Sequence, residues 1–137
     1  MEGVEFDPLK LENQLCFPLY ACAREVVKKY KPFLDDIDLT YTQYVTMMVL
    51  WEKPVVTSKE IGEKLHLDSG TLTPVIKKLA EKGLVTRSRS TEDERNLVVT
   101  LTDGGRALRQ RALSIPGRSE EHTSELQSQC FISYAVF

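Results

Sequence analysis

Residues 67–79 read Leu-Asp-Ser-Gly-Thr-Leu-Thr-Pro-Val-Ile-Lys-Lys-Leu and are the most informative part of the sequence for its fold. Its apolar residues recur with the period of a helix that buries one face, and they are Leu72, Val75, Ile76 and Leu79. The opposite face is small, polar or basic, with Gly70, Pro74 and Lys77 at its centre and Thr73 and Lys78 at its flanks. The pattern predicts an amphipathic helix that runs to about Lys82, where Gly83 supplies the C-terminal stop.

A second helix is predicted immediately before this one. Thr57 and Glu60 have the spacing of a capping box, which starts a short helix from Ser58 to about Leu65, and residues 67–70 form the connecting turn. After Gly83, residues 84–90 and 96–101 favour two strands around a wholly polar loop. Two short helices followed by a hairpin with a charged tip are the layout of a winged helix-turn-helix.

Further helices are predicted on both sides of this unit. Residues 9–30 carry an apolar stripe that includes Cys16, with a kink expected at Pro18 and an end at Pro32 and the acidic residues that follow. Residues 40–51 read as a buried helix opened by a capping box, with Met47, Met48 and Trp51 in the core. Thr102 caps a last helix toward Leu113. The predicted fold class is mainly α with a small β-hairpin.

The exposed side of the 68–82 helix suits the major groove of DNA. Its hydroxyl groups and the free N–H groups of its first turn can meet base edges and phosphates, while lysines and hairpin arginines supply positive charge. The candidate DNA-binding residues are Ser69, Thr71, Thr73, Lys77, Lys78, Arg87, Arg89, Asp93 and Arg95. Asp93 can pair with Arg95 and direct it. The alternative is a solvated helix face beside an ordinary hairpin tip.

Charge is distributed unevenly along the 137 residues, whose formal net charge is −2. Residues 1–53 carry 6 basic and 9 acidic side chains, residues 54–117 carry 11 and 8, and residues 118–137 carry 1 and 3. The basic part is therefore the part with the DNA-reading pattern. The N-terminus has no signal peptide and no run is apolar enough for a membrane helix, so we expect a cytoplasmic protein.

Residues 9–117 resemble the multiple-antibiotic-resistance regulator (MarR) family of bacterial transcription factors. The motifs that carry the resemblance are residues 67–79 and Asp93-Glu-Arg95 followed by Leu101-Thr102. The resemblance implies a homodimer on a palindromic operator in double-stranded DNA. It also implies that the 68–82 helix enters the major groove and Arg95 the minor groove.

Residues 11–17, Leu-Glu-Asn-Gln-Leu-Cys-Phe, resemble the branch of this family that senses organic hydroperoxides and related oxidants. The resemblance implies that oxidation of Cys16 releases DNA and that Tyr20, Tyr30 and Tyr41 surround the thiol. Tyr20 lies one helical turn from Cys16, so its hydroxyl can approach the sulfur and stabilise the reactive thiolate. Tyr30 lies about 21 Å along the helix, so it can reach only the Cys16 of a partner subunit.

Three other interpretations remain open at this stage. Cys16 can be a small buried apolar residue with a structural role, in a regulator that responds to a small aromatic ligand instead of a peroxide. A thiol peroxidase is a weak alternative, because no peroxidatic loop or resolving cysteine is recognisable. A winged-helix protein-interaction module would leave the candidate cations unused. We expect no enzyme activity, no cofactor and no metal site, since there are two histidines and no paired Cys-x-x-Cys motif.

The resemblance stops after Gly117. Residues 118–128 resemble the translation of a sequencing-library adapter, and residues 129–137 read as further read-through. We therefore expect a winged-helix domain with a sensor helix over residues 1–117 and a non-native tail over residues 118–137. The tail would replace the C-terminal dimerisation helix of the family, and Cys130 within it is not expected to be a resolving cysteine.

Overall fold

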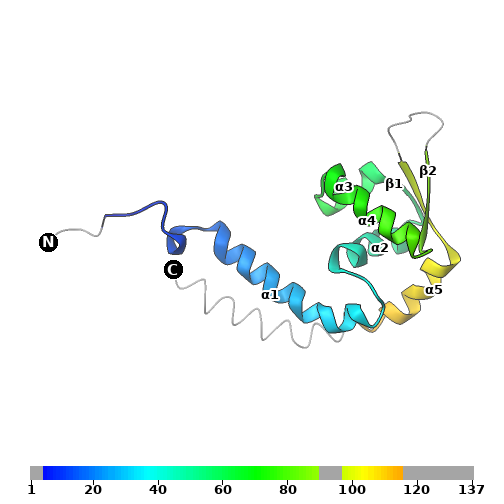
Figure 1. Cartoon of the computed structure of the whole chain (residues 1–137), viewed down its shortest axis with the longest axis horizontal. Coiled ribbons are helices and arrows are strands. Elements are labelled where there is room, and N and C mark those ends of the chain that lie inside the picture. Colours follow the sequence, from blue (N-terminus) through cyan, green and yellow to red (C-terminus); the bar gives the residue numbers. More distant parts are fainter. Residues whose placement is uncertain (1–4, 90–96, 116–137) are drawn as a thin grey trace. The chain divides into compact units, whose positions relative to one another are not determined.

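The computed structural model describes residues 5–89 and 97–115 (Figure 1). Its helices are a 3-10 turn η1 (Leu11–Asn13) and α1 (Cys16–Asp35), α2 (Tyr41–Glu52), α3 (Ser58–Leu65), α4 (Ser69–Glu81) and α5 (Asp103–Ala112). Its strands are β1 (Val55–Thr57), β2 (Val85–Arg89) and β3 (Leu97–Leu101). The sequence predictions for Asp93, Arg95, Cys130 and the tail from residue 118 lie outside the described residues.

The described residues form two compact units, and the boundary between them falls inside α1. One unit contains residues up to 31 together with Ile115, and the other, here called the reading head, contains residues 32–114. The reading head holds all of α2 to α5 and the three strands. The described part of the predicted winged helix-turn-helix therefore lies entirely within the reading head.

The core of the reading head lies between α2, α3, α4 and the sheet. Its least exposed large side chains are Met47, Leu50, Ile61, Leu72, Ile76, Leu79 and Val99. The three from α4 are the buried stripe predicted from the sequence, whereas Val75 of the same stripe is only half-buried. Met48 was assigned to the core wrongly: it is 45% exposed, because α2 turns that position away from α3 and α4.

The sheet has three antiparallel strands in the order β1-β3-β2, so the wing is wider than the predicted hairpin. Val85 of β2 lies opposite Leu101 of β3, and Val56 of β1 lies opposite Val99. Residues directly opposite each other share a face of the sheet, and these four are buried. The sequence prediction missed β1 because three residues show no periodicity of their own.

Helix caps explain most of the element boundaries. The capping box of Thr40 and Gln43 is present at the start of α2, Thr57 caps α3, and Thr102 caps α5. Gly83 follows α4 with φ 75°, a left-handed conformation that glycine adopts without strain. These boundaries agree with those predicted from the sequence to within about two residues.

The first helix differs from its prediction in three ways. It begins at Cys16 rather than near Leu9, so Pro18 lies in the first turn, where its missing N–H breaks no helical hydrogen bond and causes no kink. It continues through Pro32 to Asp35. The predicted apolar stripe is not covered by the described residues, since Leu34 is the only buried residue of α1 among them.

Candidate nucleic-acid interface and thiol site

The N-terminus of α4 is organised by Asp68. Its Oδ1 accepts a hydrogen bond of 2.7 Å from the backbone N–H of Thr71, which places the carboxylate at the N-cap position of the helix. Hydrogen bonds from the Thr71 side chain and the Thr71 backbone lower the pKa of Asp68. Asp68 was predicted only as part of a turn, although an aspartate immediately before an apolar helical pattern is a signal for a cap.

Asp68→Asn tests this cap by separating charge from hydrogen bonding. Because the pKa of Asp68 is lowered in the folded state, its charge stabilises the fold above the ordinary aspartate pKa of about 3.9, and this contribution is lost as pH falls through the folded value. We expect the wild type to melt above Asp68→Asn at pH 7, and the two melting temperatures to converge toward pH 2–3. A difference that stays constant over a pH series of thermal melts would contradict this assignment.

Three hydroxyl side chains lie on the exposed surface of the first two turns of α4. They belong to Ser69, Thr71 and Thr73, as the sequence predicted. Thr73 Oγ1 donates a hydrogen bond of 2.7 Å to the Ser69 carbonyl, and Thr71 is bonded to Asp68. The hydroxyls of Thr71 and Thr73 are therefore held by these hydrogen bonds, and each oxygen retains the capacity to accept another.

Basic side chains flank these hydroxyls on α4 and on β2. Lys77 and Lys78 are exposed one turn further along α4, and Lys78 forms a surface ion pair of 3.4 Å with Glu81. Arg87 and Arg89 are exposed and lie opposite Val99 and Leu97, so their stems continue the face of the sheet that packs on the helices. Lys77, Lys78, Arg87 and Arg89 are thus exposed and available to phosphates.

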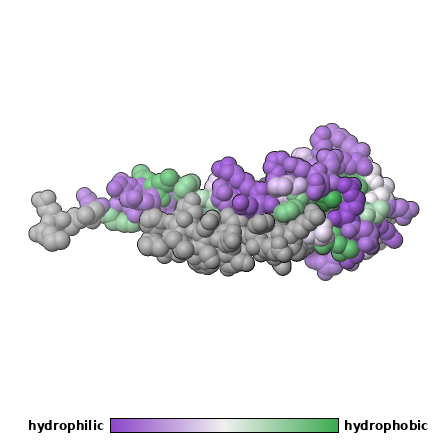
Figure 2. Space-filling model, turned by 90° about the horizontal axis from the view of Figure 1, so that it is seen from below, coloured by the Kyte–Doolittle hydropathy of each residue, from purple (hydrophilic) through white to green (hydrophobic). Residues whose placement is uncertain are grey.

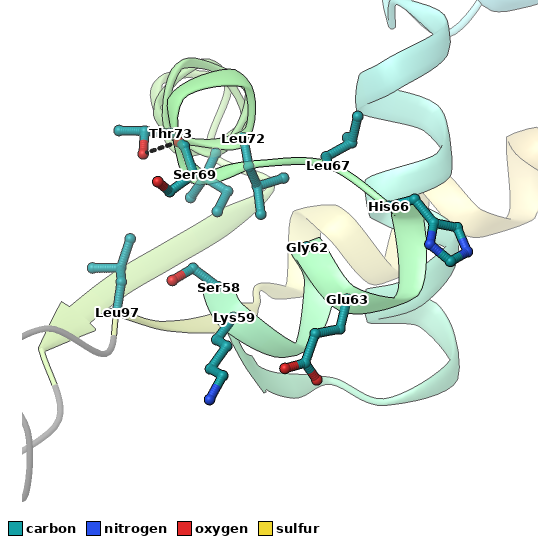
Figure 3. Close-up of a pocket in the computed structure, with 11 residues that line it drawn as sticks. Ser58, Lys59, Gly62, Glu63, His66, Leu67, Ser69, Leu72, Thr73 and Leu97 are labelled. Carbon is teal, nitrogen blue, oxygen red and sulfur yellow. Dashed lines mark hydrogen bonds between the residues drawn. The ribbon is translucent and has the colours of Figure 1, made fainter.

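A hollow of about 690 Å³ lies between α3 and α4 (Figure 3). Ser58 and Lys59 from α3 and Ser69, Leu72 and Thr73 from α4 line it, with Leu97 of β3 at one end and His66 at the other. No local sequence pattern predicts this hollow, because its lining comes from three elements that are separated along the chain. Two of its lining residues, Ser69 and Thr73, are also candidate DNA contacts.

The thiol of Cys16 lies at the first residue of α1, where it is exposed. Tyr20 is one turn further on and 60% exposed, and the Arg24 guanidinium lies 5.5 Å from the centre of its ring. Tyr30 is half-buried in the same uninterrupted helix, which keeps the long separation from Cys16 that the sequence predicted. Tyr41 belongs to the reading head, where it is the first residue of α2.

Among residues 5–89 and 97–115, no helix is long and apolar enough to cross a membrane. Within the same ranges, no three histidine, cysteine or acidic side chains are grouped so that they could hold a metal ion. Cys22, six residues further along α1, is half-buried.

Comparison with known proteins shows which regulators the chain is similar to. A family model described as transcriptional regulator SarA/Rot matches residues 28–111. The organic hydroperoxide resistance transcriptional regulator of Bacillus subtilis is 53% identical over 113 residues, which cover 82% of this chain and 77% of that protein.

Solved structures give the same result. Reduced AbfR bound to DNA matches with a TM-score of 0.72 and 34% identity, covering 87% of this chain and 90% of that one. The crystal structure of MarR, 22% identical, matches with a TM-score of 0.68 over 77% of each chain, which shows the shared fold. These matches are to DNA-binding regulators and not to enzymes. The chain therefore belongs to the SarA/Rot type of the MarR family of winged helix-turn-helix transcriptional regulators.

Proposed function

We propose that this chain is a cytoplasmic repressor that binds a palindromic operator as a homodimer and releases it when an organic hydroperoxide oxidises Cys16. The observation that carries the proposal is the exposed Cys16 thiol at the start of α1, in a chain 53% identical to an organic hydroperoxide resistance regulator. An exposed thiol is accessible to a peroxide, whereas a buried structural cysteine is inert.

In this proposal α4 enters the major groove. The exposed hydroxyls of Ser69, Thr71 and Thr73 face base edges and phosphates, and Lys77, Lys78, Arg87 and Arg89 neutralise phosphates. The DNA-bound state of AbfR, a structural neighbour, supports this role for the fold. Asp93 and Arg95 remain candidate DNA contacts from the sequence alone, because they lie outside the described residues.

A homodimer accounts for the apolar surface of the N-terminal unit. Leu9, Leu15 and Leu19 are 90%, 80% and 63% exposed, and Figure 2 shows hydrophobic surface around the start of α1. Apolar surface of this extent on a regulator indicates a protein interface. In the proposed dimer the partner subunit's α1 covers it, which brings the tyrosines of one chain to the thiol of the other.

The sensing reaction needs only the peroxide and the thiolate. The Cys16 sulfur attacks one peroxide oxygen, so an S–O bond forms as the O–O bond breaks, and the other oxygen leaves as an alcohol after taking a proton. The sulfur loses two electrons and the peroxide gains them. The sulfenic acid adds an oxygen atom among Tyr20, Tyr30 and Tyr41, and we propose that the resulting repacking changes the spacing of the two reading heads.

Operator binding before and after oxidation tests the proposal. A duplex selected from random sequence by the reduced chain would be titrated by fluorescence anisotropy, with and without cumene hydroperoxide. We expect oxidation to weaken wild-type binding by about 10-fold or more, within the usual range of allosteric coupling. Cys16→Ser should bind the reduced-state operator normally and not respond, whereas Cys22→Ser, the matched control, should respond like the wild type.

Two results would count against the proposal in different ways. If the oxidised wild type keeps its affinity for the operator, peroxide sensing is refuted but DNA binding is not. If Cys16→Ser still releases DNA on oxidation, the sensing residue is not Cys16. Analytical ultracentrifugation of the same samples tests the dimer, because a monomer at all concentrations would refute it.

The hollow between α3 and α4 favours a second candidate function, control by a small aromatic ligand. Its volume of about 690 Å³ falls in the range of small-molecule sites, and it mixes the apolar Leu72 and Leu97 with hydroxyls of Ser58 and Thr73. A ligand there would lie against two candidate DNA contacts. Release of the operator by benzoate, unchanged in Cys16→Ser and absent in Leu72→Trp, would support this function over peroxide sensing.

A further inference from the structure

The corner between α1 and α2, residues 36–39, is held by two basic side chains from distant parts of the reading head. The Arg111 guanidinium in α5 donates to the Asp36 carbonyl, and the Lys82 ammonium donates to the Asp38 carbonyl. The corner is therefore bonded to two residues that are far away in the sequence: Lys82 is 44 positions from Asp38, and Arg111 is 75 positions from Asp36. Both acceptors are backbone carbonyl oxygens, so these two bonds do not depend on the side chains of the corner residues.

Lys82 is the better placed of the two to affect DNA binding, because it is the C-cap residue of α4. Its ammonium also donates to Gln43 Oε1 at 3.1 Å, and it lies 3.6 Å from Asp38 Oδ2. The contact with the Asp38 carboxylate is a surface ion pair, since Asp38 is 93% exposed, and such pairs contribute little. The bonds to the Asp38 carbonyl and to Gln43 are the ones that fix position.

Gln43 makes this contact part of a larger arrangement. Its side chain is buried, and Oε1 also accepts the backbone N–H of Thr40 at 3.1 Å in the capping box of α2. One oxygen therefore joins the start of α2 to the end of α4. Asp38, whose carbonyl Lys82 also binds, has a φ of 54°, an uncommon conformation that the contact helps to hold.

The rest of α4 is held mainly by apolar packing. Leu72, Ile76 and Leu79 bury the inner face of the helix, but hydrophobic contact has no preferred direction. The cap at Asp68 is local to the helix, so it does not fix the helix relative to the fold. Hydrogen bonds to DNA weaken steeply with small errors in distance and angle, so the end of α4 opposite the DNA needs a directional anchor.

We infer that Lys82 is a positioning residue for DNA binding: it anchors the C-terminal end of α4 to the α1–α2 corner and so sets the direction in which Ser69, Thr71 and Thr73 meet the operator. Lys82 lies 11 residues after Thr71, about 17 Å along the helix, and its ammonium is occupied within the reading head. Its effect on affinity is therefore indirect. The inference requires DNA binding alone and holds whether or not Cys16 is the sensor.

Lys82→Met tests the inference in the full reduced chain, because methionine keeps an apolar stem and removes the donors. We expect operator Kd to rise about 5- to 20-fold, the usual size of coupling between separated sites. The slope of log Kd against log salt should not change, because no phosphate contact is lost. Lys82→Arg, which retains a donor for the same acceptors, should recover most of the affinity.

Two controls separate positioning from general effects. Lys64→Met removes the same charge from a surface pair with Glu52 and should leave Kd within about twofold of the wild type. Trp51→Phe removes the hydrogen bond of 2.9 Å from Nε1 to the Gly105 carbonyl and should lower the melting temperature without changing Kd. Comparison with Trp51→Phe shows whether lost stability alone weakens binding.

The inference is overturned by any of three results. Unchanged Kd in Lys82→Met would mean that the anchor does not position α4. A salt slope smaller by about one would mean that Lys82 contacts a phosphate directly. An equal rise of Kd in Trp51→Phe would mean that Lys82 acts through stability.

Discussion

Gly105→Ala is expected to lower the free energy of unfolding by about 3 kcal/mol or more, and the melting temperature by roughly 15 °C. A Cβ atom at this position would overlap the Leu84 carbonyl and lie 2.5 Å from Leu101 Cδ1. The Leu84 carbonyl cannot move aside easily, because it accepts the backbone N–H of Thr102 at 3.1 Å, immediately before α5. The clash would push α5 away from the sheet and from the Trp51 side chain that binds the Gly105 carbonyl.

The neighbouring glycine provides a matched control for this prediction. A Cβ atom on Gly104 would lie 3.3 Å from the Gly83 carbonyl and 3.6 Å from Thr102 Oγ1, which small adjustments can accommodate. Alanine is favoured over glycine in helices by up to about 1 kcal/mol, so Gly104→Ala should melt near or above the wild type. Thermal melts followed by circular dichroism measure both. Equal melting temperatures for the two variants would contradict the packing described for α5.

Thr71→Glu is expected to weaken operator binding by roughly 100-fold while the fold remains as stable as the wild type. Thr71 is exposed in the first turn of α4, on the surface that we propose meets DNA, so a carboxylate there would face phosphates. The same carboxylate is favourable for the helix itself, since the third helical position after an N-cap suits glutamate. Binding and stability should therefore change independently.

Gln110→Glu is the control for the added charge. Gln110 is exposed on α5. Gln110→Glu adds one negative charge, as Thr71→Glu does, but leaves the surface of α4 unaltered. Anisotropy titrations should show affinity within about threefold of the wild type for Gln110→Glu, because exposed charges beyond a Debye length are screened. If Thr71→Glu binds as tightly as Gln110→Glu, α4 does not enter the groove with this surface, and the proposed interface is wrong.

The helices of the reading head and its strands β2 and β3 were predictable because their signals are local. The stripe of Leu72, Ile76 and Leu79, the cap at Thr57 and the stop at Gly83 each depend on residues a few positions apart. The exposed positions of Ser69, Thr71, Thr73, Lys77 and Lys78 follow from the same period. Where a signal was weaker, the prediction was wrong: Pro18 does not kink α1, because the helix begins only two residues before it.

The candidate site was only partly predictable. The motif around Cys16 identified the sensor branch, and the Bacillus relative agrees with that identification. Whether Tyr20, Tyr30 and Tyr41 surround the thiol depends on a partner chain and stays a proposal. Two features could not be predicted from a local pattern, because they join residues far apart in sequence. They are the hollow between α3 and α4 and the contact of Lys82 with Gln43.

Periodicity, caps and short motifs involve only neighbouring residues, so the helices, strands β2 and β3, the exposed hydroxyl groups of α4 and the family were all predictable from the sequence. Three features became evident only in the folded chain: which of two adjacent glycines has no room for a side chain, that β1 joins the sheet, and that Lys82 contacts the α1–α2 corner. These features depend on what lies against a residue from elsewhere in the chain. Gly104 and Gly105 are the same residue type in the sequence, but only Gly105 lies against the Leu84 carbonyl.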